Sequence, residues 1–461
     1  MQAWLRNAVY LLVVLAASPW LIWSAFRRGK YRTGWNQKLW GQVPLREGTA
    51  PCVWMHAVSV GEVLQLQSIV TGWRARHPDW QIVISTTTTT GYDVAVKKYP
   101  DCRVIYYPLD FSWAVQSALN RIRPDLVALV ELELWPNFVE QLSRRQIPIT
   151  VINGRLSERS ARGYRWIRPV MRQMLSRLSE IAVQSQAYAD RFIDLGADPR
   201  RVTITGSIKF DGVQTDRGNP KTVAIRESFG LQPQETVFVA GSTQAPEEQL
   251  AIETWLALRS AFPDLRLLLV PRHKERFEEV AELVRGTFQL PLLRRSELLW
   301  NGKSVSTAKT DSASAPVLLL DTLGELAAAW GLADVAFVGG SLSTRGGQNM
   351  IEPAAYGATV MFGPNTQNFR DVVSLLLSHQ AATVVRSGAD LKAEVTRCLT
   401  QPDAARQQGA RAQQLVLAQQ GATQRTLDRL DRCLSVSTGN TSEDGQPDAD
   451  LVRAGRSRFA A

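Results

Sequence analysis

The chain has 461 residues, of which 45% are hydrophobic and 21% charged, and its formal net charge is +10. This composition excludes a wholly disordered or fibrous chain, and the length predicts two packed domains of about 200 residues each. The positive charge indicates an anionic partner, and nucleic acid, an acidic membrane surface or a charged substrate would each serve. The four cysteines stand singly, which favours reduced thiols in a cytosolic fold.

The N-terminal segment is the first strong signal, because residues 7–25 carry no formal charge and are almost wholly apolar. At 1.5 Å rise per residue, about 20 such residues cross a bilayer core of ~30 Å. The basic residues within 27–32 follow directly and predict a cytoplasmic location for the rest of the chain. We predict a membrane anchor over residues 1–30, either spanning the bilayer or lying in its interface, and the basic cluster argues against the alternative of a cleaved signal peptide.

The first domain is expected over residues 31–211, where apolar runs of strand length alternate with helical periodicity. This alternation predicts an α/β fold with a doubly wound parallel sheet. A long basic helix is expected near Tyr164 to Leu178. The expected strands lie within residues 52–59, 81–89, 103–108, 126–135, 148–154, 180–185 and 202–207.

The second domain is expected over residues 223–436, after a polar linker at 212–222. Residues 301–316 are typical of a mobile surface loop, and residues 437–461 of a disordered tail. Two successive doubly wound domains facing a cleft form the architecture called GT-B among glycosyltransferases. The five expected strands lie within residues 236–243, 265–273, 316–322, 334–341 and 358–364.

The carboxyl ends of the strands are the expected ligand-binding edge of such sheets. After a strand that ends near Val58, Glu62 opens the next helix. A carboxylate in a first helical turn is often only a cap, stabilised by free backbone N–H groups. At a turn facing the cleft, however, Glu62 could also take a proton from a sugar hydroxyl.

A pair of carboxylates, Glu131 and Glu133, follows the apolar strand that begins at Leu126. If the strand continues, both side chains share one face of the sheet. Buried carboxylates need partners or a raised pKa, so the pair is either functional or a structural ion pair. Lys209, after the strand near the linker, could neutralise a sugar carboxylate or a departing phosphate.

The second domain repeats this pattern of small or basic turns after strands. Its glycines permit close backbone approach, the helix starts favour anions, and Arg272 adds a bidentate phosphate donor. Asn349 and Glu352 are three residues apart, which suits either nucleotide binding or helix capping. The sequence has no HxH, HExxH or GxxxxGK[ST] motif, so we expect neither a metal site nor a common nucleotide hydrolase.

The motifs HAVSVGE, ELELWPN, NGRLSERSARGY, GSIKFD, AGST, PRHKERF, DTLGEL and GGSLSTRGGQNMIEP follow one another in this order. With them and its N-terminal anchor segment, the chain resembles the Kdo (3-deoxy-D-manno-octulosonic acid) transferases of lipopolysaccharide biosynthesis, over nearly its whole length up to about residue 435. The resemblance implies an inverting, metal-independent GT-B glycosyltransferase without a cofactor. It would move Kdo from CMP-Kdo to a lipid A precursor at the cytoplasmic face of the inner membrane, and it would bind no nucleic acid.

The resemblance also implies the roles of individual residues. Glu62 would be the catalytic base, and Glu131 and Lys209 would stabilise the transition state, with Glu133 as a less favoured alternative to Glu131. The residues implied to hold CMP are Pro271, Arg272, Leu323, Gly324, Glu325, Asn349, Met350, Ile351 and Glu352. Gln348 and Gln244 depart from the family pattern, which has histidine at both positions, and glutamine carries no charge at neutral pH.

Two further alternatives remain open at this point. The chain could be another GT-B transferase or a sugar epimerase using a UDP-sugar, or a non-catalytic membrane protein that binds anionic lipid. The arginine-rich segment 154–178 could contact an anionic bilayer through its interleaved apolar residues, or it could pack as an ordinary amphipathic helix on the sheet.

Overall fold

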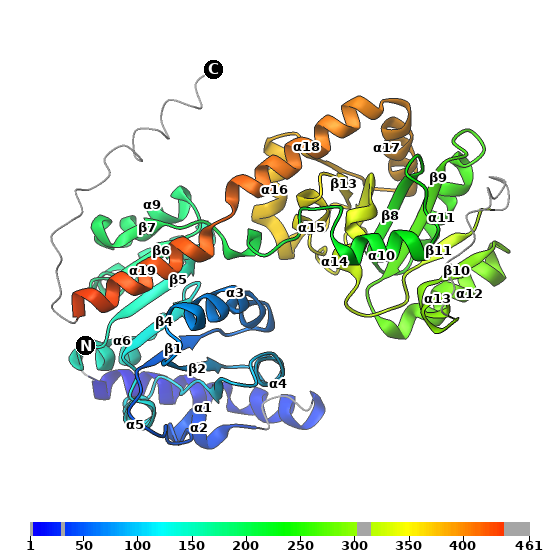
Figure 1. Ribbon diagram of the computed structural model, residues 1–461. Coiled ribbons are helices and arrows are strands. Elements are labelled where there is room, and N and C mark those ends of the chain that lie inside the picture. Colours follow the sequence, from blue (N-terminus) through cyan, green and yellow to red (C-terminus); the bar gives the residue numbers. More distant parts are fainter. Residues whose placement is uncertain (1–2, 29–32, 302–314, 438–461) are drawn as a thin grey trace. The chain divides into compact units, whose positions relative to one another are not determined.

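The computed structural model describes residues 3–28, 33–301 and 315–437 (Figure 1). The chain forms two compact units, one of residues 1–209 with 421–461 and one of residues 210–420. The final helix of the described chain, α19, Ala422–Ser437, therefore belongs to the first unit. The sequence analysis instead assigned everything up to residue 436 to the second domain, because helical periodicity does not reveal which sheet a helix covers.

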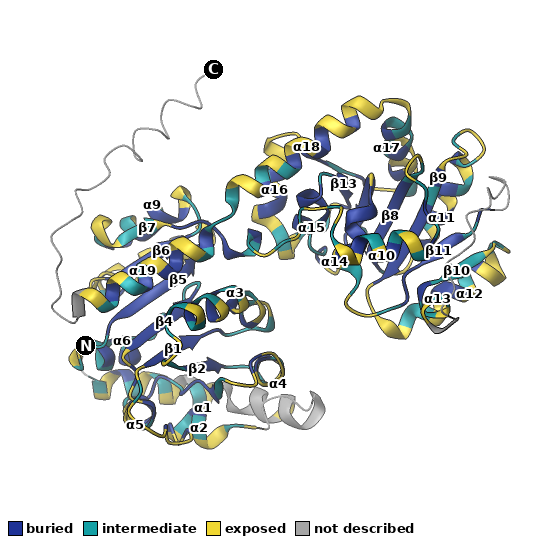
Figure 2. Cartoon of the chain, viewed as in Figure 1, coloured by how far each residue is buried: buried dark blue, intermediate teal, exposed yellow. Residues whose placement is uncertain are grey.

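The first unit is built on a seven-stranded parallel sheet, as predicted, and its strand order is β3-β2-β1-β4-β5-β6-β7. Strands β1 and β4 are wholly buried, which explains their continuous apolar sequences (Figure 2). The strands are β1 Cys52–His56, β2 Gln81–Thr86, β3 Arg103–Tyr106, β4 Leu126–Val130, β5 Ile149–Gly154, β6 Glu180–Val183 and β7 Val202–Ile204.

The helices of this unit follow the strands and cover the sheet. Apolar residues of α19, namely Leu427 and Leu430, are buried in the same core as β1 and α3. Besides α19 the helices are α1 Ala3–Arg28, α2 Trp35–Trp40, α3 Val60–Arg76, α4 Thr89–Lys98, α5 Ser112–Ile122, α6 Pro136–Arg144, α7 Glu158–Arg165, α8 Arg168–Leu175 and α9 Gln186–Asp194, with 3₁₀ turns at Pro199–Arg201 and Ile208–Phe210.

The second unit repeats the architecture with the parallel order β10-β11-β9-β8-β12-β13-β14. The five predicted strands are present. Two short edge strands, β10 Leu292–Arg294 and β14 Ala382–Val384, were not predicted, and most of their residues are only half-buried. The remaining strands are β8 Thr236–Thr243, β9 Leu265–Pro271, β11 Val317–Leu319, β12 Val335–Val338 and β13 Thr359–Phe362.

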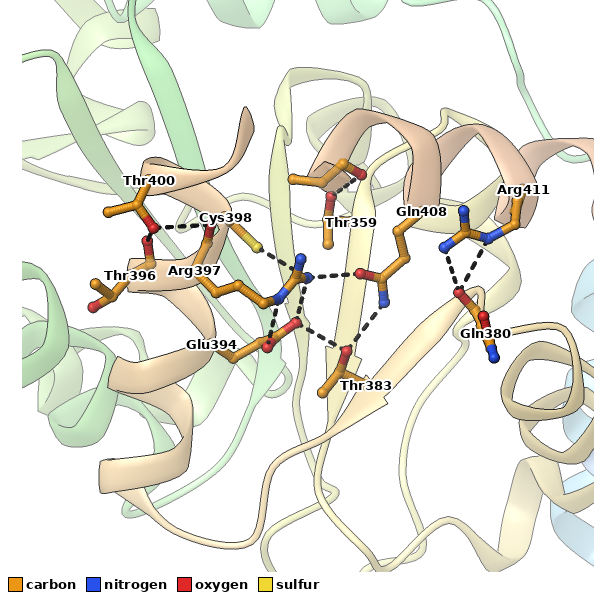
Figure 3. A network of polar contacts seen from close by, with 11 residues as sticks. Thr359, Gln380, Thr383, Glu394, Thr396, Arg397, Cys398, Thr400, Gln408 and Arg411 are labelled. Carbon is orange, nitrogen blue, oxygen red and sulfur yellow. Dashed lines mark hydrogen bonds and ion pairs between the residues drawn. The ribbon is translucent and has the colours of Figure 1, made fainter. Parts of the chain in front are cut away.

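The helices of the second unit alternate with its strands. A closed ring of hydrogen bonds joins α17, α18 and β14 (Figure 3). Arg397 of α17 donates to Glu394 of the same helix and to Gln408 of α18, and Thr383 of β14 bonds with the same two residues. The helices are α10 Pro220–Ser228, α11 Glu247–Leu258, α12 Phe277–Glu282, a π turn at Leu283–Thr287, α13 Arg295–Asn301, α14 Leu326–Ala329, α15 Ile351–Ala355, α16 Arg370–Ser378, α17 Gly388–Thr400 and α18 Pro402–Gln419.

The predicted anchor forms helix α1, whose one side docks on the first unit. Arg6 pairs with Glu140, and the Asn7 side-chain amide donates to the Ser112 hydroxyl at 2.7 Å. In the described part of the chain, no helix meets the length and apolarity that a membrane crossing requires. Residues 438–461 of the predicted tail and residues 302–314 of the predicted loop lie outside the described residues.

The predicted long basic helix is in fact two helices, α7 and α8, and this expectation was wrong. Pro169 lies in the first turn of α8, and the helix is interrupted at Trp166 and Ile167. Met171 of α8 is buried against the sheet, whereas the Trp166 side chain at the break is 90% exposed. The segment thus combines a packed helix with an exposed apolar corner.

Candidate active site

The strand order of the first sheet reverses between β1 and β4, which lie side by side. Such a switch point leaves a crevice at the carboxyl ends of the strands, where ligands of doubly wound folds bind. Glu62 follows β1 at the start of α3, and Glu131 follows β4 directly. The two residues that the sequence analysis ranked first therefore follow the two strands that flank this crevice.

Glu62 forms a capping box with Ser59 at the start of α3. Its carboxylate accepts hydrogen bonds from the Ser59 hydroxyl and the Val58 backbone N–H, each at 2.8 Å, while the Ser59 hydroxyl accepts from the Glu62 N–H at 3.4 Å. The capping interpretation is thus correct as a description of the geometry. A carboxylate has about four acceptor positions, however, so two donors leave capacity for a substrate proton, and Glu62 is only half-buried.

Glu131 has a left-handed backbone with φ of 58°. A residue that is neither glycine nor asparagine rarely adopts this conformation, and such strain gathers at functional sites. Because β4 ends at Val130, the strand does not continue through Glu131 and Glu133. The prediction that Glu131 and Glu133 share one face of the sheet because they alternate along a strand was therefore wrong.

Glu133 nevertheless lies close to the other two carboxylates. The pKa of Glu133 is raised to about 7, mainly by burial and also by the charges of Glu62 and Glu131, while a hydrogen bond from the Trp135 indole at 3.2 Å opposes the shift. Burial and Glu133 together raise the pKa of Tyr164 in α7. Three carboxylates from two turns therefore form one acidic cluster, and at neutral pH Glu133 is partly protonated.

Asn153, at the end of β5, positions the segment that carries Lys209. Asn153 is fully buried with a left-handed φ of 52°. Its side-chain oxygen accepts the Ile208 N–H at 3.2 Å, and its amide donates to Gln65 of α3 at 2.9 Å. The sequence analysis missed this residue, although an Asn-Gly pair directly after a buried strand is a signal for a left-handed turn.

His56, at the end of β1, is a buried core histidine. Burial lowers the pKa of its imidazole to about 3, although a hydrogen bond with Ser85 opposes the shift. The ring stacks on Tyr107 with centroids 3.9 Å apart, and its Nδ1 lies 2.9 Å from the Ser85 hydroxyl. His56 is therefore neutral and packed, and it is not an acid or base at physiological pH.

The sheet of the second unit has its own switch point, between β8 and β12. Glu247, in the first turn of α11 after β8, is fully buried there. Its carboxylate accepts the backbone N–H groups of Gly340, Ser341 and Leu342 at 2.7 to 3.0 Å, and that of Gln244 at 2.9 Å. The glycine turn that was expected to receive an anion is thus occupied by a carboxylate of the protein itself.

Three predicted CMP contacts come together in this unit. The Asn349 amide donates to Glu352 at 3.0 Å, and the Asn349 oxygen accepts the Ile351 N–H at 3.1 Å. Burial raises the pKa of Glu352, while Asn349, the nearby Arg272 charge and Trp330 oppose the shift. A guanidinium directly after β9, together with a carboxylate and an amide at the start of α15, suits a phosphate and hydroxyl groups.

The other predicted contacts differ in what they can offer. Met350 and Ile351 are buried in the core, and Pro271 ends the buried strand β9, so only their backbones could reach a ligand. Leu323 is 71% exposed, and Gly324 has a φ of 84°. Burial raises the pKa of Glu325, but its ion pair with Arg295 at 2.9 Å and a bond from Thr322 outweigh burial and lower it.

The two departures from the family pattern meet at one point. A Cβ atom placed on Gly340 would lie 3.2 Å from the Gln348 side-chain nitrogen and 3.6 Å from that of Gln244. The Gly347 N–H donates to the Gly340 carbonyl at 2.8 Å, which folds the loop back and brings Gln348 there. Sequence alone gave no indication that the two glutamines are neighbours.

No cluster of three or more His, Cys, Asp or Glu side chains that could hold a metal ion occurs within the described ranges. The absence of a cofactor therefore stays an expectation.

Comparison with known proteins agrees with the resemblance. Residues 28–212 match the family model described as "3-Deoxy-D-manno-octulosonic-acid transferase (kdotransferase)". A 3-deoxy-D-manno-octulosonic acid transferase of Haemophilus influenzae is 34% identical over 390 residues, which cover 83% of this chain and 88% of the relative. The transferase of Bordetella pertussis is 31% identical and covers 92% of this chain and 99% of its own length.

The fold has further relatives among solved structures. A UDP-GlcNAc 2-epimerase from Neisseria meningitidis, solved with UDP-GlcNAc, superposes with a TM-score of 0.55 at 12% identity, covering 83% of this chain and all of the epimerase. This likeness confirms the GT-B type of fold alone. With these relatives over most of its length, the chain belongs to the 3-deoxy-D-manno-octulosonic acid (Kdo) transferases, the glycosyltransferases that transfer Kdo in lipopolysaccharide biosynthesis.

Proposed function

We propose that the chain transfers Kdo from CMP-Kdo to a hydroxyl of a lipid A precursor, with inversion and without a metal ion, and that Glu62 is the base. The observation that carries this proposal is the acidic cluster at the switch point of the first sheet, formed by Glu62, Glu131 and Glu133. An attacking sugar hydroxyl must lose its proton as the new bond forms, and a positioned carboxylate can accept it.

Glu62 is the best placed of the three carboxylates. The capping box fixes its side chain through two donors and leaves further acceptor positions of the carboxylate open for a substrate proton. Glu133, whose pKa is raised to about 7, is partly protonated at neutral pH and suits hydrogen-bond donation to the acceptor sugar.

Glu131 and Lys209 are proposed as transition-state stabilisers. Glu131 has a strained backbone directly after the end of β4. Asn153 holds the segment before Lys209 by accepting a hydrogen bond from the Ile208 N–H. A lysine ammonium at this edge would offset charge on the Kdo carboxylate or the leaving phosphate. Both roles rest on the family resemblance together with these positions at strand ends.

The second unit is proposed to bind CMP. Arg272 supplies a cation for the phosphate, while Glu352 and Asn349 supply an acceptor and a donor for the hydroxyl or base groups. Residues 323–325 form a turn in which Leu323 is exposed. Because Gly324 has no side chain, its backbone groups can approach a ligand closely.

Membrane attachment is proposed to occur through α1 lying in the bilayer interface. One side of the helix holds Arg6 and Asn7 against the first unit, whereas Trp4, Leu12 and Leu15 are 57 to 67% exposed. A helix with one docked side and one apolar exposed side suits an interfacial position. Such a position would bring the acidic cluster to a lipid-linked acceptor at the cytoplasmic face of the inner membrane.

The substitution Glu62→Gln tests the base. Glutamine can also form a capping box, so the fold should keep its midpoint of thermal unfolding, but the amide cannot accept the proton. We expect kcat for Kdo transfer to fall by about 10² to 10⁴, with CMP binding unchanged. Mass spectrometry of the lipid product and a thermal-shift titration with CMP measure the two effects.

Ser59→Ala is the matched control, because it removes the two Ser59 hydrogen bonds of the capping box and leaves the Glu62 carboxylate with its bond from the Val58 N–H. This variant should lose about 1 kcal/mol of stability and keep most of its activity. If Glu62→Gln transfers Kdo at a near-normal rate, the assignment of the base is wrong. If Ser59→Ala loses as much activity as Glu62→Gln, the role of Glu62 is structural.

A further inference from the structure

The amino-terminal edge of the first sheet contains a cavity of about 450 Å³. It opens where β5, β6 and β7 begin, whereas the acidic cluster follows the carboxyl ends of β1 and β4. At about 3.3 Å per residue, the four residues of β6 alone separate the two edges by roughly 13 Å. We call it the arginine cavity, and its polar lining includes Arg177, Ser179, Glu180, Arg200, Arg201 and Arg432.

The positive groups of the arginine cavity are only partly compensated. Arg200 pairs with Asp198 at 2.8 Å. The Arg201 guanidinium donates to two neutral carbonyls, those of Ser176 and Leu178, at 2.9 and 2.7 Å, and so keeps its charge. Within the described part of the chain, Arg177 and Arg432 make no ion pair.

One carboxylate lines the arginine cavity. Glu180 is 5% exposed, and its Oε1 lies 3.9 Å from Nε of Arg429, a further cation beside the cavity. Five guanidinium groups therefore face two carboxylates, those of Glu180 and Asp198. The excess of fixed positive charge at a concave surface suits a ligand with two negative charges or with several acceptor oxygens.

The helix α6 connects this cavity with the docked side of α1. Its residue Glu140 pairs with Arg6 of α1, and its later residue Ser143 lines the cavity. The Arg177 charge also acts on Glu140. A phosphate carried by a lipid and a phosphate free in solution are thus both conceivable sources of the same chemical group.

We propose that the arginine cavity is a second binding site of this chain, separate from the acidic cluster, and that it takes a phosphate group through Arg177, Arg201 and Arg432. Guanidinium groups bind phosphate oxygens in a bidentate manner. Arg177 is half-buried and Arg201 and Arg432 are exposed, so a ligand can reach all three from solvent. The proposal is independent of the assignment of the base, since it concerns the opposite edge of the sheet.

The test uses the full chain in detergent and chloride buffer, with inorganic phosphate and dihexanoyl phosphatidylglycerol as probes in separate calorimetric titrations. The double variant Arg177→Ser/Arg432→Ser removes two guanidinium groups that make no ion pair, so the fold should persist. We expect its affinity for a bound probe to fall roughly tenfold or more relative to the unchanged chain.

The matched control is Lys97→Ser/Lys98→Ser, which removes two exposed charges from α4 in the same unit. Its affinities should stay within about twofold, because screening weakens distant charges. An equal loss for both probes supports a site for free phosphate, and a loss for the lipid alone supports a headgroup site. Equal affinities of the unchanged chain and the arginine variant, or an equal loss in the lysine control, would overturn the proposal. If the double variant is not folded by circular dichroism, Arg432→Ser alone carries the same comparison.

Discussion

The two switch points of this protein place a glutamate in the same local position and use it in opposite ways. Glu62 follows the first strand of its sheet and opens α3, and Glu247 follows the first strand of its sheet and opens α11. Glu62 is half-buried and accepts two hydrogen bonds, whereas Glu247 is fully buried and accepts four from backbone N–H groups. A carboxylate at a strand end is therefore available for chemistry only where its neighbours leave acceptor positions open.

The two glutamates differ because different groups face them from the segment that follows the neighbouring strand. In the second unit, the turn after β12 presents three successive N–H groups to Glu247. In the first unit, the segment after β4 presents further carboxylates, Glu131 and Glu133, to Glu62. In the second unit, the N–H groups satisfy the buried Glu247 carboxylate and hold the loop in place. In the first unit, three carboxylates concentrate negative charge that a substrate or cation must balance.

Removal of the buried carboxylate is expected to have the largest effect on stability. Glu247→Ala leaves the N–H groups of Gly340, Ser341 and Leu342 buried without an acceptor, and each such group costs about 1 to 3 kcal/mol. We expect the free energy of unfolding to fall by about 3 kcal/mol or more, measured by urea denaturation. Glu253→Ala, an exposed position on the same helix, should change it by less than about 0.5 kcal/mol. A small loss for Glu247→Ala would mean that the loop holds itself and that the two glutamates differ less than their contacts indicate.

The acidic cluster should give a pH dependence of smaller size. The pKa of Glu133 is raised to about 7 in the folded chain from 4.5, so the folded state favours its protonated form. Stability from this group is therefore greatest below about pH 4.5 and is lost as the pH rises through about 7. Glu133→Gln should unfold at a higher temperature than the unchanged chain at pH 8, with the gap closing toward pH 5. A gap that stays constant from pH 5 to pH 8 would show that Glu133 is not perturbed. Glu158→Gln, which changes an exposed glutamate in α7, is the control.

The smallest effect is expected at the two glutamines beside Gly340. Because Gln244 and Gln348 approach the same point, the effects of Gln244→His and Gln348→His on KM for CMP-Kdo should not be additive, with a coupling energy of about 0.5 to 1 kcal/mol. Protonated imidazoles there would attract the anionic donor, so the double variant should bind CMP-Kdo better at pH 6 than at pH 8. Additive effects at both pH values would show that the glutamines act separately. Gln249→His, on the exposed side of α11, provides the reference for a lone substitution.

Much of the fold was predictable because its signals are local. Among the buried parallel strands, β4 is a continuous apolar run of five residues and β1 one of four that ends at His56, and the alternation with helices fixes the doubly wound class. The edge strands β10 and β14, whose residues are mostly only half-buried, were missed. The break between α7 and α8 could have been predicted from Pro169, whose ring disfavours a continuous helix.

The candidate site was predictable only in part. The motifs placed Glu62, Glu131 and Lys209 at strand ends, and the ordered set of motifs identified the family. Asn153 was missed because its role depends on Ile208 and Gln65, which are distant in sequence. The side chains of Met350 and Ile351 are in the core, a fact that their places within a functional motif concealed.

The sequence by itself determined the fold class, the family and the positions at which chemistry could occur, because strand runs, turns and motif order are properties of neighbouring residues. Only the tertiary structure decided which carboxylates have open acceptor positions, that α19 returns to the first sheet, that Gln244 and Gln348 meet, and that four arginines line one cavity. The physical reason is that burial, pKa and hydrogen-bond satisfaction depend on groups brought together across tens or hundreds of residues, and a linear pattern holds no record of which ones meet.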